Sequence, residues 1–121
     1  MEKRYFGEFE TVDDIHNEFG WPTDVTDEEV LLAVYVEEEY SGTAGVIFKR
    51  NGNLFEVEAD HCSCNNLTGQ WDPKPVTWGA LRMRLMDNCL WLRRRYSNEF
   101  ADAFEALVNM ATFWEEAETH D

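Results

Sequence analysis

The chain has 121 residues, of which 44% are hydrophobic, and it carries a formal net charge of −15 at pH 7. This length suits a single domain with its own core, and eight Phe, five Trp and four Tyr exclude a disordered chain. The charge argues against direct binding of nucleic acid or of an anionic membrane, because both need clustered Lys and Arg. We therefore predict one domain over residues 1–121, made of an N-terminal arm and helix (1–25), a sheet (26–72) and a helical part (73–121).

The N-terminal helix is expected to begin after Thr11, a residue type that caps helix N-termini. Ile15 and Phe19 fall on one apolar face, and Gly20 supplies a C-terminal stop. His16 lies on the same face, and we interpret it as a partly buried packing residue rather than a ligand.

Three strands are predicted next. Val30–Glu37 is rich in β-branched and aromatic residues, which favours a strand, although Thr26–Glu29 before it resembles a helix capping box. Asn51-Gly52 stands between two apolar runs and predicts a hairpin of strands at 44–49 and 54–58, because both central residues of a type I′ turn need positive φ.

The strand at 54–58 alternates, with Leu54, Glu56 and Glu58 on one face and Phe55 and Val57 on the other. One face of the sheet should therefore meet a core while the other carries acidic groups. The prediction is a three-stranded, mainly antiparallel sheet.

The C-terminal part shows helical periodicity from a cap at Thr77 to about residue 119. One helix of about forty residues and two shorter helices both fit this pattern. We prefer two, with a break at 96–98, because Arg93-Arg94-Arg95 suits a helix C-terminus and Ser97 suits a new N-terminus. The expected fold is α+β: an N-terminal helix, the three-stranded sheet, and two C-terminal helices packed on one sheet face.

Charge is unevenly distributed along the chain. Residues 1–72 contain 17 acidic and 4 basic residues, residues 73–96 contain 1 acidic and 6 basic, and residues 97–121 contain 7 acidic and none basic. The arginines of the Arg82–Arg95 helix could form ion pairs within the chain. Alternatively, this helix could form a homodimer by meeting the acidic face of a second copy.

Three cysteines are few and odd in number, which fits reduced thiols or a metal site better than a disulfide framework. His61, Cys62, Cys64 and Cys89 could together supply the four ligands that zinc takes. Cys-Ser-Cys leaves only one residue between ligands, however, which is shorter than zinc-binding spacings, so no metal site and no cofactor are favoured.

A nucleophilic cysteine with a histidine base is the other chemical alternative for this segment. An acidic environment opposes the thiolate, and no oxyanion, nucleotide-loop or metalloprotease motif accompanies it. The chain is therefore predicted not to be an enzyme. The cysteines are interpreted as small packing residues of a structural turn.

Several segments between residues 40 and 78 resemble a sequence pattern found in small proteins of tailed bacteriophages. These segments are Tyr40-Ser41-Gly42-Thr43-Ala44, Gly52-Asn53-Leu54-Phe55-Glu56-Val57, His61-Cys62-Ser63-Cys64, Leu67, Gln70-Trp71 and Pro73. The resemblance implies a phage or prophage origin and an intracellular setting in the bacterial host. The lack of an apolar run of 18 residues and of a signal-peptide core agrees with the host cytoplasm.

The functional hypothesis is a phage-encoded acidic protein that binds and inhibits a host protein, with an anti-phage defence complex as the expected target. Nucleic-acid mimicry, in which carboxylates take the places of phosphates, is one route to such inhibition. The expected partner is a host protein with a basic surface. The alternative is a small metal- or thiol-dependent protein centred on His61, Cys62, Cys64 and Cys89. The residues predicted to contact the partner are Asp27, Glu28, Glu29, Glu37, Glu38, Glu39, Glu56 and Glu58.

Overall fold

The structure, a computed structural model, describes residues 3–62 and 66–118, and their side chains except those of 88–91 and 112–118. The chain divides into two compact units, Met1–Pro75 (the first unit) and Val76–Asp121 (the second unit). The single domain expected from the length stays a prediction, as does the packing of the C-terminal helices on the sheet. Within residues 3–62 and 66–118, no helix combines the length and apolar character needed to cross a bilayer.

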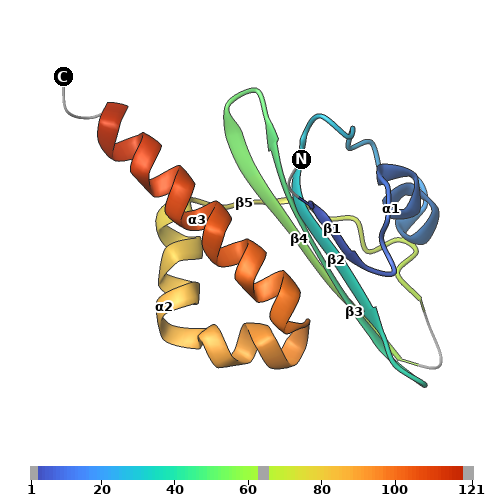
Figure 1. The fold of residues 1–121 in the computed structure, drawn as a ribbon. Helices are drawn as coiled ribbons and strands as arrows, with labels where there is room; N and C mark the ends of the chain where they lie inside the picture. Colours follow the sequence, from blue (N-terminus) through green and yellow to red (C-terminus); the bar gives the residue numbers. More distant parts are fainter. Residues whose placement is uncertain (1–2, 63–65, 119–121) are drawn as a thin grey trace. The chain divides into compact units, whose positions relative to one another are not determined.

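The described residues of the first unit form a five-stranded mixed sheet in the spatial order β1-β2-β3-β4-β5 (Figure 1). The strands are β1 (Tyr5–Gly7), β2 (Val30–Glu37), β3 (Gly42–Arg50), β4 (Asn53–His61) and β5 (Lys74–Pro75). β1 runs parallel to β2, and the other neighbouring pairs are antiparallel. The prediction of a three-stranded, mainly antiparallel sheet is therefore wrong, whereas the α+β class is confirmed.

The two strands missing from the prediction are the outer ones, β1 and β5. Each has three residues or fewer, too short to show the alternation by which a strand is recognised in a sequence. β1 pairs with residues 28 positions further along, since Tyr5 is the partner of Ala33. Pro75 is tolerated in β5 because this strand lies at the sheet edge.

The central hairpin agrees with its sequence signal. Asn51 and Gly52 have φ of 54° and 81°, as a type I′ turn requires. β2 has the predicted bounds, and β3 and β4 are longer than predicted because their pairing continues from Arg50↔Asn53 to Gly42↔His61. The turn therefore fixes a register nine residues long.

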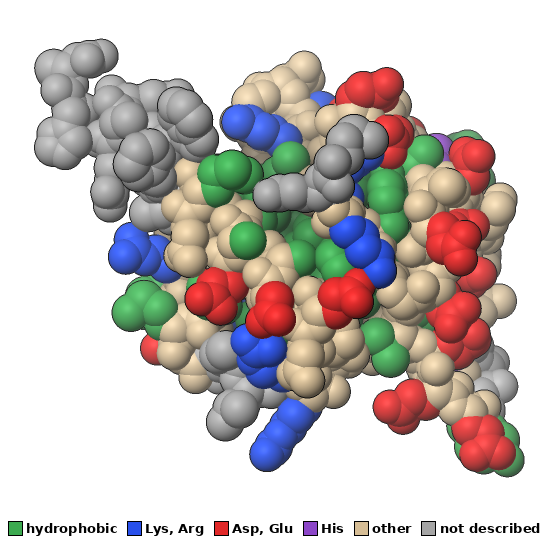
Figure 2. All heavy atoms as spheres, viewed as in Figure 1, with side chains coloured by type: hydrophobic (Ala, Val, Ile, Leu, Met, Phe, Trp, Pro, Cys, Tyr) green, Lys and Arg blue, Asp and Glu red, His purple; other side chains and the backbone are tan. Residues whose placement is uncertain are grey.

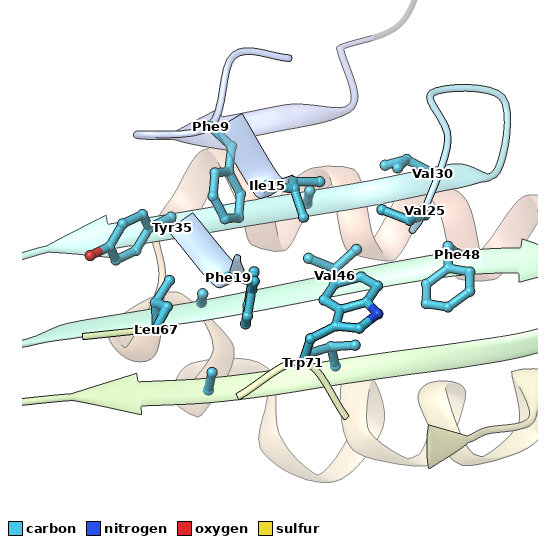
Figure 3. Close-up of a cluster of buried hydrophobic side chains, with 14 residues drawn as sticks. Phe9, Ile15, Phe19, Val25, Val30, Tyr35, Val46, Phe48, Leu67 and Trp71 are labelled. Carbon is cyan, nitrogen blue, oxygen red and sulfur yellow. The ribbon is translucent and has the colours of Figure 1, made fainter. Parts of the chain in front are cut away.

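One face of this sheet packs against α1 (Val12–Phe19) and the segment at 67–71 (Figures 1 and 3). Asp14 stabilises the start of α1, because its carboxylate accepts hydrogen bonds from the backbone N–H groups of Glu10 and Thr11, at 2.7 and 3.1 Å. The core side chains are Phe9, Ile15, Phe19, Val25, Val30, Ala33, Tyr35, Ala44, Val46, Phe48, Val57, Ala59, Leu67 and Trp71.

Trp71 connects the parts of this core. Its ring stacks on that of Phe48 at a centroid distance of 5.7 Å, and it meets Phe19 edge-on at 5.2 Å (Figure 3). Gln70, next to it, donates from Nε2 to the carbonyl oxygens of Asp60 and Asn66, at 2.9 and 2.8 Å. The Gln-Trp pair therefore fixes the segment after β4 against the sheet and α1.

The described residues of the second unit form two helices, α2 (Trp78–Arg95) and α3 (Asn98–Glu118). The preference for two helices with a break near Tyr96 is thus confirmed. Thr77 Oγ1 accepts a hydrogen bond from the Ala80 N–H at 3.0 Å, and Ser97 Oγ accepts one from the Phe100 N–H at 3.1 Å. Buried apolar side chains line both helices: Leu81, Leu92, Tyr96, Phe100, Ala101, Phe104 and Val108.

Candidate protein-binding surface

Tyr35 on β2 and His61 on β4 form a polar contact at one end of the sheet. The Tyr35 hydroxyl lies 2.8 Å from His61 Nε2, and Nδ1 of His61 lies 3.2 Å from the carbonyl oxygen of Cys62. Because a carbonyl can only accept, Nδ1 donates to Cys62, and the Tyr35 hydroxyl also lies 3.4 Å from Glu37 Oε1, which accepts from it. The side chain of His61 is only 10% exposed.

Gly42, on the strand between them, makes this contact geometrically feasible. It pairs with Glu37 on one side and with His61 on the other. A Cβ atom at this position would collide with the rings of both His61 and Tyr35. The imidazole therefore occupies the space above a residue without a side chain.

The negative charges of three residues from different elements act on the Tyr35 hydroxyl, and Glu37 Oε1 lies 3.4 Å from it. Burial is the main cause that raises the pKa of Tyr35 to about 12, and the negative charges of Glu37, Glu18 and Glu8 raise it further. Glu8 follows β1, Glu18 lies on α1 and Glu37 ends β2. We call these three residues the acidic cluster, and all are exposed.

Acidic side chains continue beyond the acidic cluster. Glu38 and Glu39 directly follow β2 and are exposed, and the backbone N–H of Glu38 donates to the Ser41 carbonyl at 2.7 Å. Figure 2 shows Asp and Glu side chains gathered over the α1 side of the first unit and the ends of its strands. Three of the predicted partner-contacting residues, Glu37, Glu38 and Glu39, are thus consecutive and exposed at the end of β2, and together with the acidic cluster we call them the acidic surface.

Asp27 and Glu29, also predicted to contact a partner, are bound by arginines of the same unit. Asp27 Oδ1 accepts hydrogen bonds from Arg4 at 2.9 Å and from the Tyr5 hydroxyl at 2.6 Å. The Tyr5 hydroxyl and the Arg4 guanidinium lower the pKa of Asp27.

Glu29 accepts two hydrogen bonds from Arg50, at 2.6 and 2.9 Å, and another from the Thr26 backbone N–H at 2.9 Å. The hydrogen bonds from Arg50 are the main reason that its pKa falls to about 2. The capping-box pattern of Thr26–Glu29 thus closes a turn before β2, not a helix. Among the three predicted residues here, Glu28 is exposed and has no ion pair recorded within the described residues.

The eight predicted residues do not form one surface. The Asp27–Glu29 turn precedes β2 and Glu37–Glu39 ends it, and eight extended residues separate these points by about 23 Å. Glu56 and Glu58 pair with Ile47 and Gly45, so they lie on the sheet face opposite the α1 core, as their alternation predicted.

The His-Cys segment is described only in part. Cys62 is exposed, whereas Cys64 and the side chain of Cys89 lie outside the described residues. Among the side chains that the structure describes, no three His, Cys, Asp or Glu residues are arranged to hold a metal ion. Zinc binding by His61, Cys62, Cys64 and Cys89 stays a prediction. His16 is half-buried, as expected for a packing residue, and its Nε2 lies 2.6 Å from the Val25 carbonyl oxygen.

Some arginines of α2 interact with residues of the second unit itself. Arg93 binds Asp102 of α3 at 2.8 Å, and the Arg95 guanidinium lies over the ring of Tyr96 at 5.5 Å. Arg82 and Arg94 are exposed. A homodimer through Arg82–Arg95 stays a prediction.

Glu8, Glu18 and the exposed side chain of Trp21 are surface residues that the sequence did not single out. No spacing links Glu8 or Glu18 to Tyr35, and in the fold the Glu8 N–H donates to the Tyr35 carbonyl at 2.8 Å. The chain matches no protein-family model, no curated protein and no solved structure. The phage resemblance therefore stays a prediction, and the geometry of the first unit carries the functional argument.

Proposed function

We propose that this chain is a phage-encoded acidic protein that binds a basic surface of a bacterial host protein and inhibits it. The expected target is an anti-phage defence complex. Binding to the host protein, not catalysis, is the activity in this proposal.

The acidic cluster is the observation that carries the proposal. Exposed carboxylates from three separate elements act on the Tyr35 hydroxyl, Glu37 from 3.4 Å, and the exposed Glu38 and Glu39 directly follow Glu37. The first unit contains 17 acidic and 5 basic residues. Arg4, Arg50 and Lys74 form ion pairs with Asp27, Glu29 and Asp72, so three of the five basic residues are engaged in the unit itself.

Such a surface favours a partner rich in Lys and Arg, because complementary potentials accelerate association and select the partner. Proteins that bind nucleic acid display clustered Lys and Arg for phosphates. An array of carboxylates could bind these Lys and Arg in place of the phosphates and so exclude the nucleic acid. Mimicry of this kind is the inhibitory mechanism that we propose.

The test begins with capture of host proteins from bacterial lysate on the immobilised chain at low and at high salt. Captured proteins are identified, purified and measured one at a time for affinity and association rate. We expect binding that weakens steeply as salt rises. The double variant Glu38→Gln/Glu39→Gln should slow association about tenfold.

A matched control removes the same charge from the second unit, as Asp87→Asn/Glu105→Gln, two exposed positions on α2 and α3. Equal loss of binding in both double variants would indicate a general charge effect and contradict the proposed surface. Absence of any partner at every salt concentration would refute the proposed function.

A further inference from the structure

Trp21 exposes almost its whole side chain. It is 91% exposed, whereas Trp71 of the same unit is 9% exposed and packs in the core. Tryptophan is among the most buried residues on average, so a nearly bare indole is unusual. Tryptophan is also enriched among the residues that dominate protein–protein binding energies.

The turn that presents Trp21 is held by hydrogen bonds on both sides. The N–H of Gly20 donates to the His16 carbonyl at 2.9 Å and ends α1, with Gly20 at φ 72°. The Gly20 carbonyl accepts from the N–H and the hydroxyl of Thr23, at 2.9 and 2.5 Å. The backbone on either side of Trp21 is therefore fixed.

The same turn is attached to the core at both ends. Phe19 is fully buried, and its carbonyl accepts from the Gly69 N–H at 3.1 Å. Val25 is buried, and its carbonyl lies 2.6 Å from His16 Nε2. A side chain on such a turn loses little conformational freedom when a partner covers it, which favours affinity.

Two acidic residues stand three positions on either side of Trp21. Glu18 and Asp24 are exposed, and Glu18 also belongs to the acidic cluster. Arg50 Nη1 lies 3.3 Å from Asp24 Oδ2, so the charge of Asp24 is partly balanced. Within the described residues, Glu18 forms no such ion pair. Lys and Arg around a pocket complement this pattern, and Arg also stacks on indole faces.

We infer that Trp21 is the anchor residue of the acidic surface, and that it inserts into an apolar pocket rimmed by Lys and Arg on a partner protein. The inference rests on the proposed function. It specifies the site on the partner protein, an apolar pocket with a basic rim, to which the acidic surface would bind. Apolar burial of the indole supplies affinity, and the carboxylates around it supply selection and rate.

The test places a photo-activatable benzophenone amino acid at position 21 of the full chain and irradiates it in bacterial lysate. Position 86 is the matched control, because Met86 is a large exposed apolar residue of the second unit. Adducts are identified, and each partner is purified for binding to Trp21→Ala, Trp21→Phe and Met86→Ala. We expect an adduct at position 21 only, with Trp21→Ala weakening the affinity at least tenfold, Trp21→Phe less, and Met86→Ala not at all.

Unchanged melting temperature of Trp21→Ala would show that the loss arises at the surface. Full affinity of Trp21→Ala, with affinity lost in Glu38→Gln/Glu39→Gln, would overturn the anchor and leave the proposed function standing. An adduct at position 86 only, or an adduct within the chain itself, would also overturn the anchor. Failure to bind any partner would refute both proposals together.

Discussion

The Tyr35 hydroxyl lies 2.8 Å from Nε2 of His61, although a whole strand separates the two residues in the sheet. This contact crosses the position of Gly42, where a methyl group would collide with both rings. It joins the end of the buried core to the acidic cluster at the surface.

Replacement of Gly42 by alanine should therefore destabilise the protein by about 1–3 kcal/mol, the usual cost of overpacking. The imidazole would have to move away and lose its hydrogen bond to Tyr35. Urea unfolding of Gly42→Ala measures this loss. Gly79→Ala is the matched control, because its Cβ meets no atom closer than 3.8 Å and α2 should gain up to about 1 kcal/mol.

A double-mutant cycle with His61→Ala identifies the cause. If the collision with the imidazole is responsible, Gly42→Ala should cost much less when His61 is already alanine. The same cost in both backgrounds would contradict this explanation.

Tyr35 should make the protein sensitive to alkali. Its pKa is raised from an ordinary value near 10 to about 12, so the folded state keeps its proton where the unfolded state loses it. The stabilisation is complete below pH 10 and is lost as the pH rises towards 12. Urea unfolding across this range should show a steeper decline for the wild type than for Tyr35→Phe.

The acidic cluster contributes to this shift. Glu8→Gln/Glu18→Gln should lower the pKa of Tyr35, because two negative charges near the hydroxyl are removed. Ultraviolet absorbance of tyrosinate, compared with Tyr35→Phe, measures the change. An unmoved titration would indicate that these carboxylates do not approach Tyr35.

The Glu29–Arg50 pair should make the protein sensitive to acid. Arg50 holds the pKa of Glu29 at about 2, below its ordinary 4.5, so the stabilisation is present above pH 4.5 and lost as the pH falls to 2. Glu29→Gln should cost about 1–2 kcal/mol at neutral pH, since Glu29 is only 20% exposed. Urea unfolding at pH 7 and at pH 3 checks both statements.

Asp72→Asn provides the control for this pair. Asp72 and Lys74 are both 72% exposed, so their ion pair should contribute less than about 0.5 kcal/mol. A cost equal to that of Glu29→Gln would mean that the bidentate geometry and burial of Glu29 do not matter.

Truncation of the two tryptophans of the first unit should change the unfolding free energy by very different amounts. Trp71→Ala removes a ring that stacks on Phe48 and touches Phe19, and should cost about 3–5 kcal/mol of unfolding free energy. Trp21→Ala should change it by less than about 0.5 kcal/mol, because that side chain makes few contacts. Urea unfolding followed by circular dichroism compares the two variants.

Local signals in the sequence were sufficient for the central strands and for the helix break. Asn51-Gly52 determines the hairpin through its backbone angles, and Ser97 marks a helix start through its hydroxyl. β1 and β5 could not be found in this way. They are too short to carry a periodic pattern, and they exist because longer strands are available as partners.

The candidate surface was harder to predict, because the sequence does not show which basic residues bind which carboxylates. Asp27 and Glu29 are 23 and 21 residues away in sequence from the arginines that bind them, Arg4 and Arg50. Conversely, nothing near Glu8 or Glu18 in the sequence indicates that their charges act on Tyr35. Pairing across the sheet decides which carboxylates remain available, and a single sequence does not reveal that pairing.

The excess of acidic over basic residues in the first unit, 17 against 5, has an energetic consequence for the uncomplexed protein. Like charges repel one another in a compact fold, so folding is opposed by an electrostatic strain that a basic partner would relieve. Dissolved salt relieves the same strain by screening. Rising ionic strength should therefore stabilise the uncomplexed fold while it dissociates the complex, because screening weakens both the repulsion within the unit and the attraction to the partner.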